Sequence, residues 1–213
     1  MSSVAINPSQ WRGLGEQAEP AWEIALLFPR QGQWTEDEYL ALDTNRLVEL
    51  SDGRIEVLPT PPPFHQRIVT YVLELLRAFV VAGKLGEVLP APLPVRLWPG
   101  KLREPDLVFV RPGRITDPLQ PPNGADLAIE VVSEGDEDRK RDLITKRDEY
   151  FRAGIQEYWI VDPEENRLTV LTPGKSGYEA HGEFTPGMTA TSKLLPGFSL
   201  DVAAVLAAGA GPV

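Results

Sequence analysis

Three residues in the middle of this chain carry side chains that could act together on a phosphodiester, namely Asp106, Glu130 and Lys146. Both acids interrupt strand-like segments that are otherwise apolar, where a carboxylate destabilises the fold unless it is paired or bound to a metal. Lys146 lies three residues after Leu143 and four before Tyr150, so it falls on the apolar stripe of a predicted helix. An ammonium that faces a core needs an anion, and the two acids are candidates. The trio predicts metal-assisted phosphodiester chemistry.

The residue types suit a hard divalent cation. Mg²⁺ or Mn²⁺ prefers oxygen ligands and keeps several waters, so Asp106, Glu130 and the backbone carbonyl of Val131 could hold an ion that stays open to phosphate. Lys146 could then orient the attacking water or stabilise the transition state, a role in which losing one preorganised donor costs on the order of a hundredfold in rate. By strand alternation, we expect Asp106 to share a face with Val108.

The same residues also have simpler explanations. One acid could cap a turn or pair with Arg103 or Arg96, and Lys146 could form an ion pair with Asp142, four residues earlier on the same helix. Such a helical pair contributes only a few tenths of a kcal/mol. A weaker alternative makes the two carboxylates the acid and base of a glycosidase, but no cluster of sugar-stacking aromatic residues accompanies them.

Three further residues are secondary candidates for the site. His65, at the start of a predicted helix, could orient a ligand or the scissile phosphate, or could hydrogen-bond to nearby backbone. Glu49 could add a carboxylate, although a glutamate in an exposed hairpin is usually solvated. Tyr150 is expected in the core with its hydroxyl near the site. With Asp142, these residues form the second tier of candidates.

The elements that must position these residues alternate between strand and helix patterns. Thr35 and Glu38 form a capping box for a short helix, and Asp52-Gly53 predicts a tight hairpin turn. The remaining pattern predicts helices at 64–82, 136–153 and 200–208, and Gly83 or Gly86 is expected to end the first of them. It also predicts strands at 94–98, 106–110, 126–132 and 157–161, and a hairpin region from 167. This order is typical of an α/β fold around a mixed sheet.

Composition limits the classes of function. The net charge of −10 repels polyanions and counts against a high-affinity nucleic-acid binder, but not against a nuclease, because bound divalent ions present a cationic face to phosphate. The absence of cysteine excludes disulfides and thiolate zinc sites, and two histidines leave little room for a histidine-rich zinc site. We find no secretory signal and no apolar run of membrane-spanning length, so we expect a cytoplasmic protein.

We expect one main domain at 34–200, preceded by an arm at 1–33 and followed by a tail at 201–213. An ordered series of motifs covers most of it. They read Glu49-Leu-Ser-Asp-Gly-Arg-Ile, Glu104-Pro-Asp-Leu-Val, Ile129-Glu-Val-Val-Ser and Ala153-Gly-Ile-Gln-Glu-Tyr-Trp-Ile-Val-Asp-Pro. In these motifs the chain, from about Trp34 to Leu171, resembles the Uma2 family, which is similar to the PD-(D/E)xK nucleases.

The resemblance implies a restriction-endonuclease-like core, a mixed β-sheet flanked by helices, with an additional N-terminal hairpin. It implies that Asp106 is the first acid and Glu130 the second. The common motif places a lysine two residues after the second acid, but Val132 stands there, so the lysine role moves to Lys146 on the next helix. The implied function is a Mg²⁺- or Mn²⁺-dependent endonuclease acting on DNA as a homodimer, since palindromic cleavage suits two-fold symmetry. The alternative is a catalytically inactive nuclease fold that serves as an oligomeric binding or scaffolding module.

Overall fold

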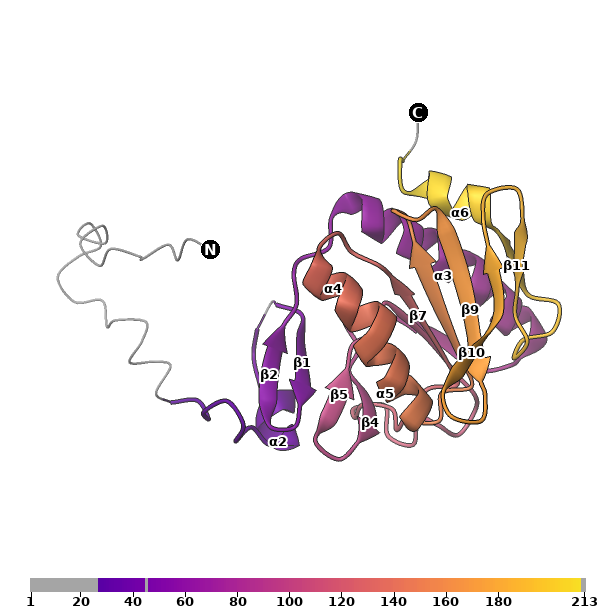
Figure 1. Ribbon diagram of the computed structural model, residues 1–213. Helices are drawn as coiled ribbons and strands as arrows, with labels where there is room; N and C mark the ends of the chain where they lie inside the picture. The colour runs from indigo at the N-terminus through magenta and orange to yellow at the C-terminus, as the bar shows by residue number, and fades with distance from the viewer. Residues whose placement is uncertain (1–26, 45, 212–213) are drawn as a thin grey trace, which may run out of the picture.

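The computed structural model describes residues 27–44 and 46–211, which form mixed sheets flanked by helices (Figure 1). The helices are α2 (Glu36–Leu40), α3 (Pro63–Gly83), α4 (Asp136–Lys140), the π-helical segment η2 (Arg141–Thr145), α5 (Lys146–Arg152) and α6 (Val202–Ala208). The strands are β1 (Val48–Ser51), β2 (Arg54–Val57), β3 (Glu87–Pro90), β4 (Val95–Trp98), β5 (Lys101–Arg103), β6 (Leu107–Val110), β7 (Leu127–Val131), β8 (Glu157–Asp162), β9 (Arg167–Pro173), β10 (Tyr178–Phe184), β11 (Thr189–Thr191) and β12 (Ser199–Asp201). Most of the arm expected at 1–33 lies outside the described residues.

The main sheet has six strands in the order β10-β9-β8-β7-β6-β3. Strands β7 and β8 are parallel, and α4, η2 and α5 form the crossover between them, as a parallel pair requires. The neighbouring pairs β6–β7 and β8–β9 are antiparallel, so the sheet is mixed. The expected α/β architecture with a mixed sheet and flanking helices is confirmed.

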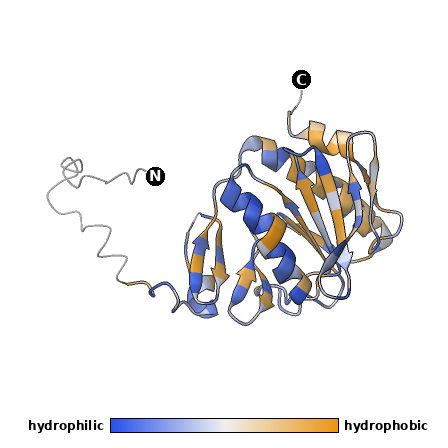
Figure 2. Ribbon diagram, viewed as in Figure 1, coloured by the Kyte–Doolittle hydropathy of each residue, from blue (hydrophilic) through white to orange (hydrophobic). Residues whose placement is uncertain are grey.

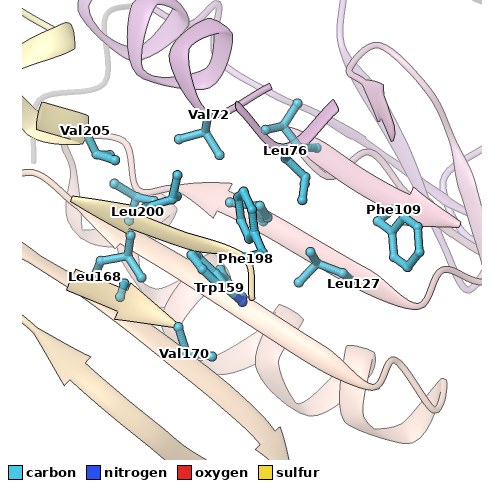
Figure 3. Close-up of a cluster of buried hydrophobic side chains, with 14 of the residues drawn as sticks. Val72, Leu76, Phe109, Leu127, Trp159, Leu168, Val170, Phe198, Leu200 and Val205 are labelled. Carbon is cyan, nitrogen blue, oxygen red and sulfur yellow. The ribbon is translucent and has the colours of Figure 1, made fainter. Parts of the chain in front are cut away.

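Apolar side chains cover both faces of this sheet. On one face, α3 and α6 pack on a cluster that includes Leu127, Trp159 and Phe198 (Figure 3). On the other face, Tyr150 of α5 packs on strand residues that include Val108 and Ala128. Successive strand residues therefore alternate between the two clusters. By the same alternation, Asp106 and Glu130 lie on the face that the α4–α5 crossover covers.

A smaller sheet, in the order β2-β1-β5-β4, lies beside the main one. Its β1–β2 hairpin turns at Asp52 and Gly53, which both adopt positive φ angles (52° and 75°), so the predicted tight turn is confirmed. The chain leaves β5 at Arg103 and enters β6 at Leu107. The short segment between these strands, which contains Asp106, therefore crosses from one sheet to the other.

Several details differ from the sequence-based expectations. Strands β3 and β5 were not predicted, because β3 ends in Pro90 and β5 has only three residues, too few to show an alternation. Helix α3 ends at Gly83, one of the two glycines predicted to end it, but the left-handed conformation is adopted by the next residue, Lys84. Ile144, which follows Leu143 in the helix predicted at 136–153, is 57% exposed. It lies in η2, where the wider π turn changes the angular position of the residues.

The helices differ in character. Figure 2 shows hydrophilic colour along much of the α4–α5 crossover, in contrast with the hydrophobic α6. Among the described residues, no helix is both long and apolar enough to cross a membrane.

Candidate active site

Strand pairing brings the two predicted acids together. Leu107 of β6 lies opposite Ile129 of β7 in an antiparallel register, so the preceding Asp106 lies beside Glu130. The Oδ2 atom of Asp106 accepts a hydrogen bond of 2.7 Å from the backbone N–H of Val131. This bond fixes the aspartate at the end of β7.

Lys146 reaches the same place from the crossover helix. It is the first residue of α5, directly after the π turn, and its side chain is only 2% exposed. Its Nζ atom lies 2.8 Å from Oε1 of Glu130 and 3.3 Å from Oε1 of Glu49. The contact with Asp142, the simpler partner considered above, is the longest at 3.7 Å. The lysine therefore faces Glu130 across the β7–α5 interface.

Tyr150 supports the second acid. Its hydroxyl donates a 2.6 Å hydrogen bond to Oε1 of Glu130, the same oxygen that accepts from Lys146. Burial and the nearby Glu130 carboxylate raise the pKa of Tyr150 well above its ordinary value, so its hydroxyl remains a donor. Two donors thus engage Oε1, which leaves Oε2 of Glu130 as the oxygen available to a ligand.

His65 joins the first acid to the backbone. Its Nε2 atom lies 2.9 Å from the carbonyl oxygen of Val131 and 3.2 Å from Oδ2 of Asp106. A carbonyl can only accept, so Nε2 carries the proton in this arrangement. Burial opposes a charge on the imidazole, but the hydrogen bond to Asp106 and its charge, together with the Val131 carbonyl and the charge of Glu130, raise the pKa of His65. Both oxygens that His65 contacts belong to the predicted metal-binding set.

Glu49, expected in an exposed hairpin, is fully buried. Its strand β1 lies between β2 and β5, so neither edge of the strand is free. Its Oε1 atom accepts from the backbone N–H of Glu104 at 2.9 Å, and its Oε2 atom accepts from Arg103 at 2.7 Å. Glu49 therefore connects Lys146 to a second charged network, which was not predicted from the sequence.

Arg103 is the centre of that network. Its guanidinium forms a forked pair with Glu149, with N···O distances of 2.7 and 3.0 Å, and also contacts Glu49 and Glu56. Arg96, the other arginine considered as a partner of the acids, instead binds Glu36 at 2.7 Å. In the described part of the chain, neither Asp106 nor Glu130 pairs with an arginine.

A small cavity of about 40 Å³ lies between these groups, with room for a cation and a water molecule or two. Its acidic lining residues are Glu104, Asp106, Glu130 and Asp142. Sequence reasoning placed Glu104 in a motif but not in the site, although its position two residues before the first acid is a usable signal. An Oδ atom of Asp142 and an Oε atom of Glu104 are buried without a hydrogen-bond partner in this structure.

The cavity is short of positive charge. Burial raises the pKa of Glu130 to about 8 despite the opposing effect of Lys146, and Asp106 adds to the rise. Burial, with the charge of Glu49, also raises the pKa of Glu104 to about 7. Within the described residues, no three His, Asp or Glu side chains are already arranged as a metal-binding group. A hard cation held by the donors predicted from the sequence, Asp106, Glu130 and the Val131 carbonyl, would need water to complete its shell.

The Arg103 network predicts a particular dependence of stability on pH. Burial tends to raise the pKa of Glu149, but its bonds to Arg103 and Lys101 are stronger and lower it. Because the folded-state pKa of Glu149 is below the ordinary value of 4.5, the ionised carboxylate stabilises the folded protein above pH 4.5. This stabilisation is lost as the pH falls through the folded-state pKa. Glu149→Gln is expected to cost about 3 kcal/mol at pH 7 and much less at acidic pH. Urea unfolding at pH 7 and at a series of pH values below 4.5 measures both, and an equal loss throughout the series would contradict the prediction.

Comparison with known proteins places this site in context. Residues 36–203 match the profile of the Uma2 family, described as "Putative restriction endonuclease". A crystal structure of "a putative nuclease belonging to DUF820 from Anabaena variabilis ATCC 29413" is similar with a TM-score of 0.67 and 20% sequence identity. That match covers 82% of this chain and 98% of the other, and it supports the restriction-endonuclease-like fold. No curated protein matches the sequence. Because the family profile spans most of its length, this chain belongs to the Uma2 family.

Proposed function

We propose that the protein is an endonuclease that hydrolyses phosphodiester bonds, with DNA as its substrate and Mg²⁺ or Mn²⁺ as its cofactor. One observation carries the proposal: Asp106, Glu130 and Lys146, from three separate segments, meet at a single small cavity. The family description and the fold both support a nuclease.

In this proposal some groups bind the cation and Lys146 acts on the reacting atoms. Asp106, Glu130 and the carbonyl of Val131 would hold the cation. When bound, the ion supplies a water of lowered pKa and neutralises charge on the phosphate. Lys146 directs an ammonium proton to the attacking water or to a non-bridging phosphate oxygen as the P–O bond to the leaving group breaks. Glu49 and Glu130 fix the position of that ammonium group.

His65 is expected to act by positioning the cation's ligands. Its Nε2–H contacts both Asp106 and the Val131 carbonyl, so His65→Ala would leave these two oxygens less well ordered. Loss of such an outer partner typically lowers metal affinity by about 10–100-fold. Calorimetry with Mn²⁺ measures this, and His65→Gln, which keeps an N–H donor, should restore part of the affinity. If both variants bind Mn²⁺ like the wild type, His65 has no such role.

The proposal is tested with supercoiled plasmid and the full-length protein. Nicking should require Mn²⁺ or Mg²⁺ and stop on addition of a chelator. A structured RNA in a parallel reaction distinguishes the two nucleic acids. No hydrolysis of either substrate with any divalent ion would overturn the proposal.

A second candidate function is a non-catalytic nuclease fold that acts as an oligomeric binding module. The observation that favours it is the close engagement of Lys146 with three carboxylates, which also suits a purely structural ion network. Sedimentation of the wild type tests the expected homodimer. A stable oligomer with neither metal binding nor hydrolysis would favour this second function.

A further inference from the structure

A larger cavity, of about 710 Å³, opens next to the catalytic one. The two cavities share four lining residues, which are Pro59, His65, Val131 and Ser133. The walls of the larger cavity come from the proline-rich connector and the start of α3, the β7–α4 loop with α4, and the β8–β9 turn. Its volume is within the range of about 300–1,000 Å³ that is usual for small-ligand sites. A group bound there would lie beside a phosphate at the catalytic cavity.

The charges on its walls argue against a phosphate as the occupant. Three carboxylates line it, from Glu134, Asp138 and Glu164, together with one guanidinium, from Arg139. That arginine is already engaged, at 2.7 Å from Asp162 and 3.0 Å from Glu164. An excess of negative charge repels the sugar–phosphate backbone. The cavity therefore suits an uncharged part of a substrate.

One wall offers a flat apolar surface. Phe64 lines the cavity and is 42% exposed. Its ring lies close to Gly209, since a Cβ atom built on that glycine would be 2.5 Å from the ring. An exposed aromatic ring is the usual platform on which an unpaired base stacks. Phe64 also directly precedes His65, which contacts Asp106.

Hydrogen-bond acceptors line the same cavity as this ring. Asp138 pairs with Arg141 at 2.7 Å, and Glu164 pairs with Arg139. Within the described residues, Glu134 is the member of the three carboxylates that no such pair engages, and it is exposed. A carboxylate accepts hydrogen bonds from the exocyclic amino group of a base such as cytosine. Thymine has no such amino group.

We propose that this cavity binds an unpaired nucleobase next to the scissile phosphate, stacked on Phe64 and bonded through its amino group to Glu134. This inference rests on the proposed nuclease function and names its substrate class: a single-stranded or locally unpaired strand. A base that is already unpaired avoids the unstacking that a paired base would require. The cavity accordingly selects adenine or cytosine over thymine at that position.

Binding can be measured without cleavage. Short oligonucleotides that contain 2-aminopurine, as a single strand and as a duplex, are titrated with the wild type in EDTA at about 0.15 M salt, which screens the repulsion by the acidic protein, with fluorescence as the readout. The single strand is expected to bind at least about tenfold more tightly than the duplex. Phe64→Ala should weaken single-strand binding at least about fivefold, the lower end of the effect of losing one stacked base. Phe28→Ala provides a matched control, because Phe28 is similarly exposed (47%) but does not line the cavity.

Base selectivity tests Glu134. In competition with unlabelled strands, the wild type should favour cytosine-rich over thymine-rich DNA, and Glu134→Gln should reduce that preference. Equal binding of single strand and duplex, or no effect of Phe64→Ala, would overturn the cavity proposal even if plasmid is cleaved. Single-strand binding that depends on Phe64, without hydrolysis under any condition, would overturn the nuclease function and leave the base-binding cavity intact.

Discussion

Replacing Lys146 with methionine is expected to lower the rate of plasmid nicking at least about 100-fold, the usual effect of removing one preorganised donor from a transition state. Methionine has nearly the same length and shape but no charge. The ammonium group is buried and lies within 3.3 Å of both Glu49 and Glu130. Its removal leaves these carboxylates without their shared cation, so the metal-free protein should lose about 3–5 kcal/mol of unfolding free energy.

Urea unfolding separates the two effects of this variant. Lys140→Met changes an exposed lysine of the same crossover helix and should alter stability by less than about 0.5 kcal/mol, with normal nicking. The double variant Glu130→Gln/Lys146→Met removes both charges of the pair and should recover part of the lost stability, but not the nicking. Wild-type nicking by Lys146→Met would remove the lysine from the catalytic set.

The sequence predicted the acids better than their surroundings. Alternation along β6 assigned Asp106 to the face that carries Val108, and Glu130 of β7 lies on the same side of the sheet, where it contacts Tyr150. It could not predict the antiparallel register that brings the two acids side by side, because that register depends on pairing between segments distant in the sequence. The contact between them is therefore a result of tertiary structure.

Glu49 shows why the rest of the site was harder to predict. Its hairpin has the alternation of a half-exposed pair of strands, and the Asp52–Gly53 turn was predicted correctly. The burial of Glu49 arises because β5, a three-residue strand with no clear pattern of its own, pairs with the other edge of β1. The π turn before Lys146 was also not predicted, since such turns have no simple sequence signature.

Asp106→Asn is the second substitution with a large expected effect, because it should abolish Mn²⁺ binding and nicking together. The side-chain amide oxygen of asparagine can still accept the hydrogen bond from Val131 N–H, so the fold should be retained. The variant should be at least as stable as the wild type, since the Asp106 charge contributes to raising the pKa values of both Glu130 and Asp142. Affinity for Mn²⁺ should fall by more than about 100-fold, beyond the effect of changing outer partners alone.

Asp126→Asn is the matched control for this experiment. Asp126 is another aspartate next to β7, but it precedes the strand, is buried, and binds Arg114 and the backbone N–H of Arg111, far along β7 from Glu130. Its variant should bind Mn²⁺ and nick plasmid as the wild type does. Calorimetric titration of all three proteins, followed by addition of plasmid to the same samples, decides the assignment. Wild-type Mn²⁺ affinity in Asp106→Asn would exclude this aspartate as a ligand, whereas a selective loss would locate the cation at the junction of β6 and β7.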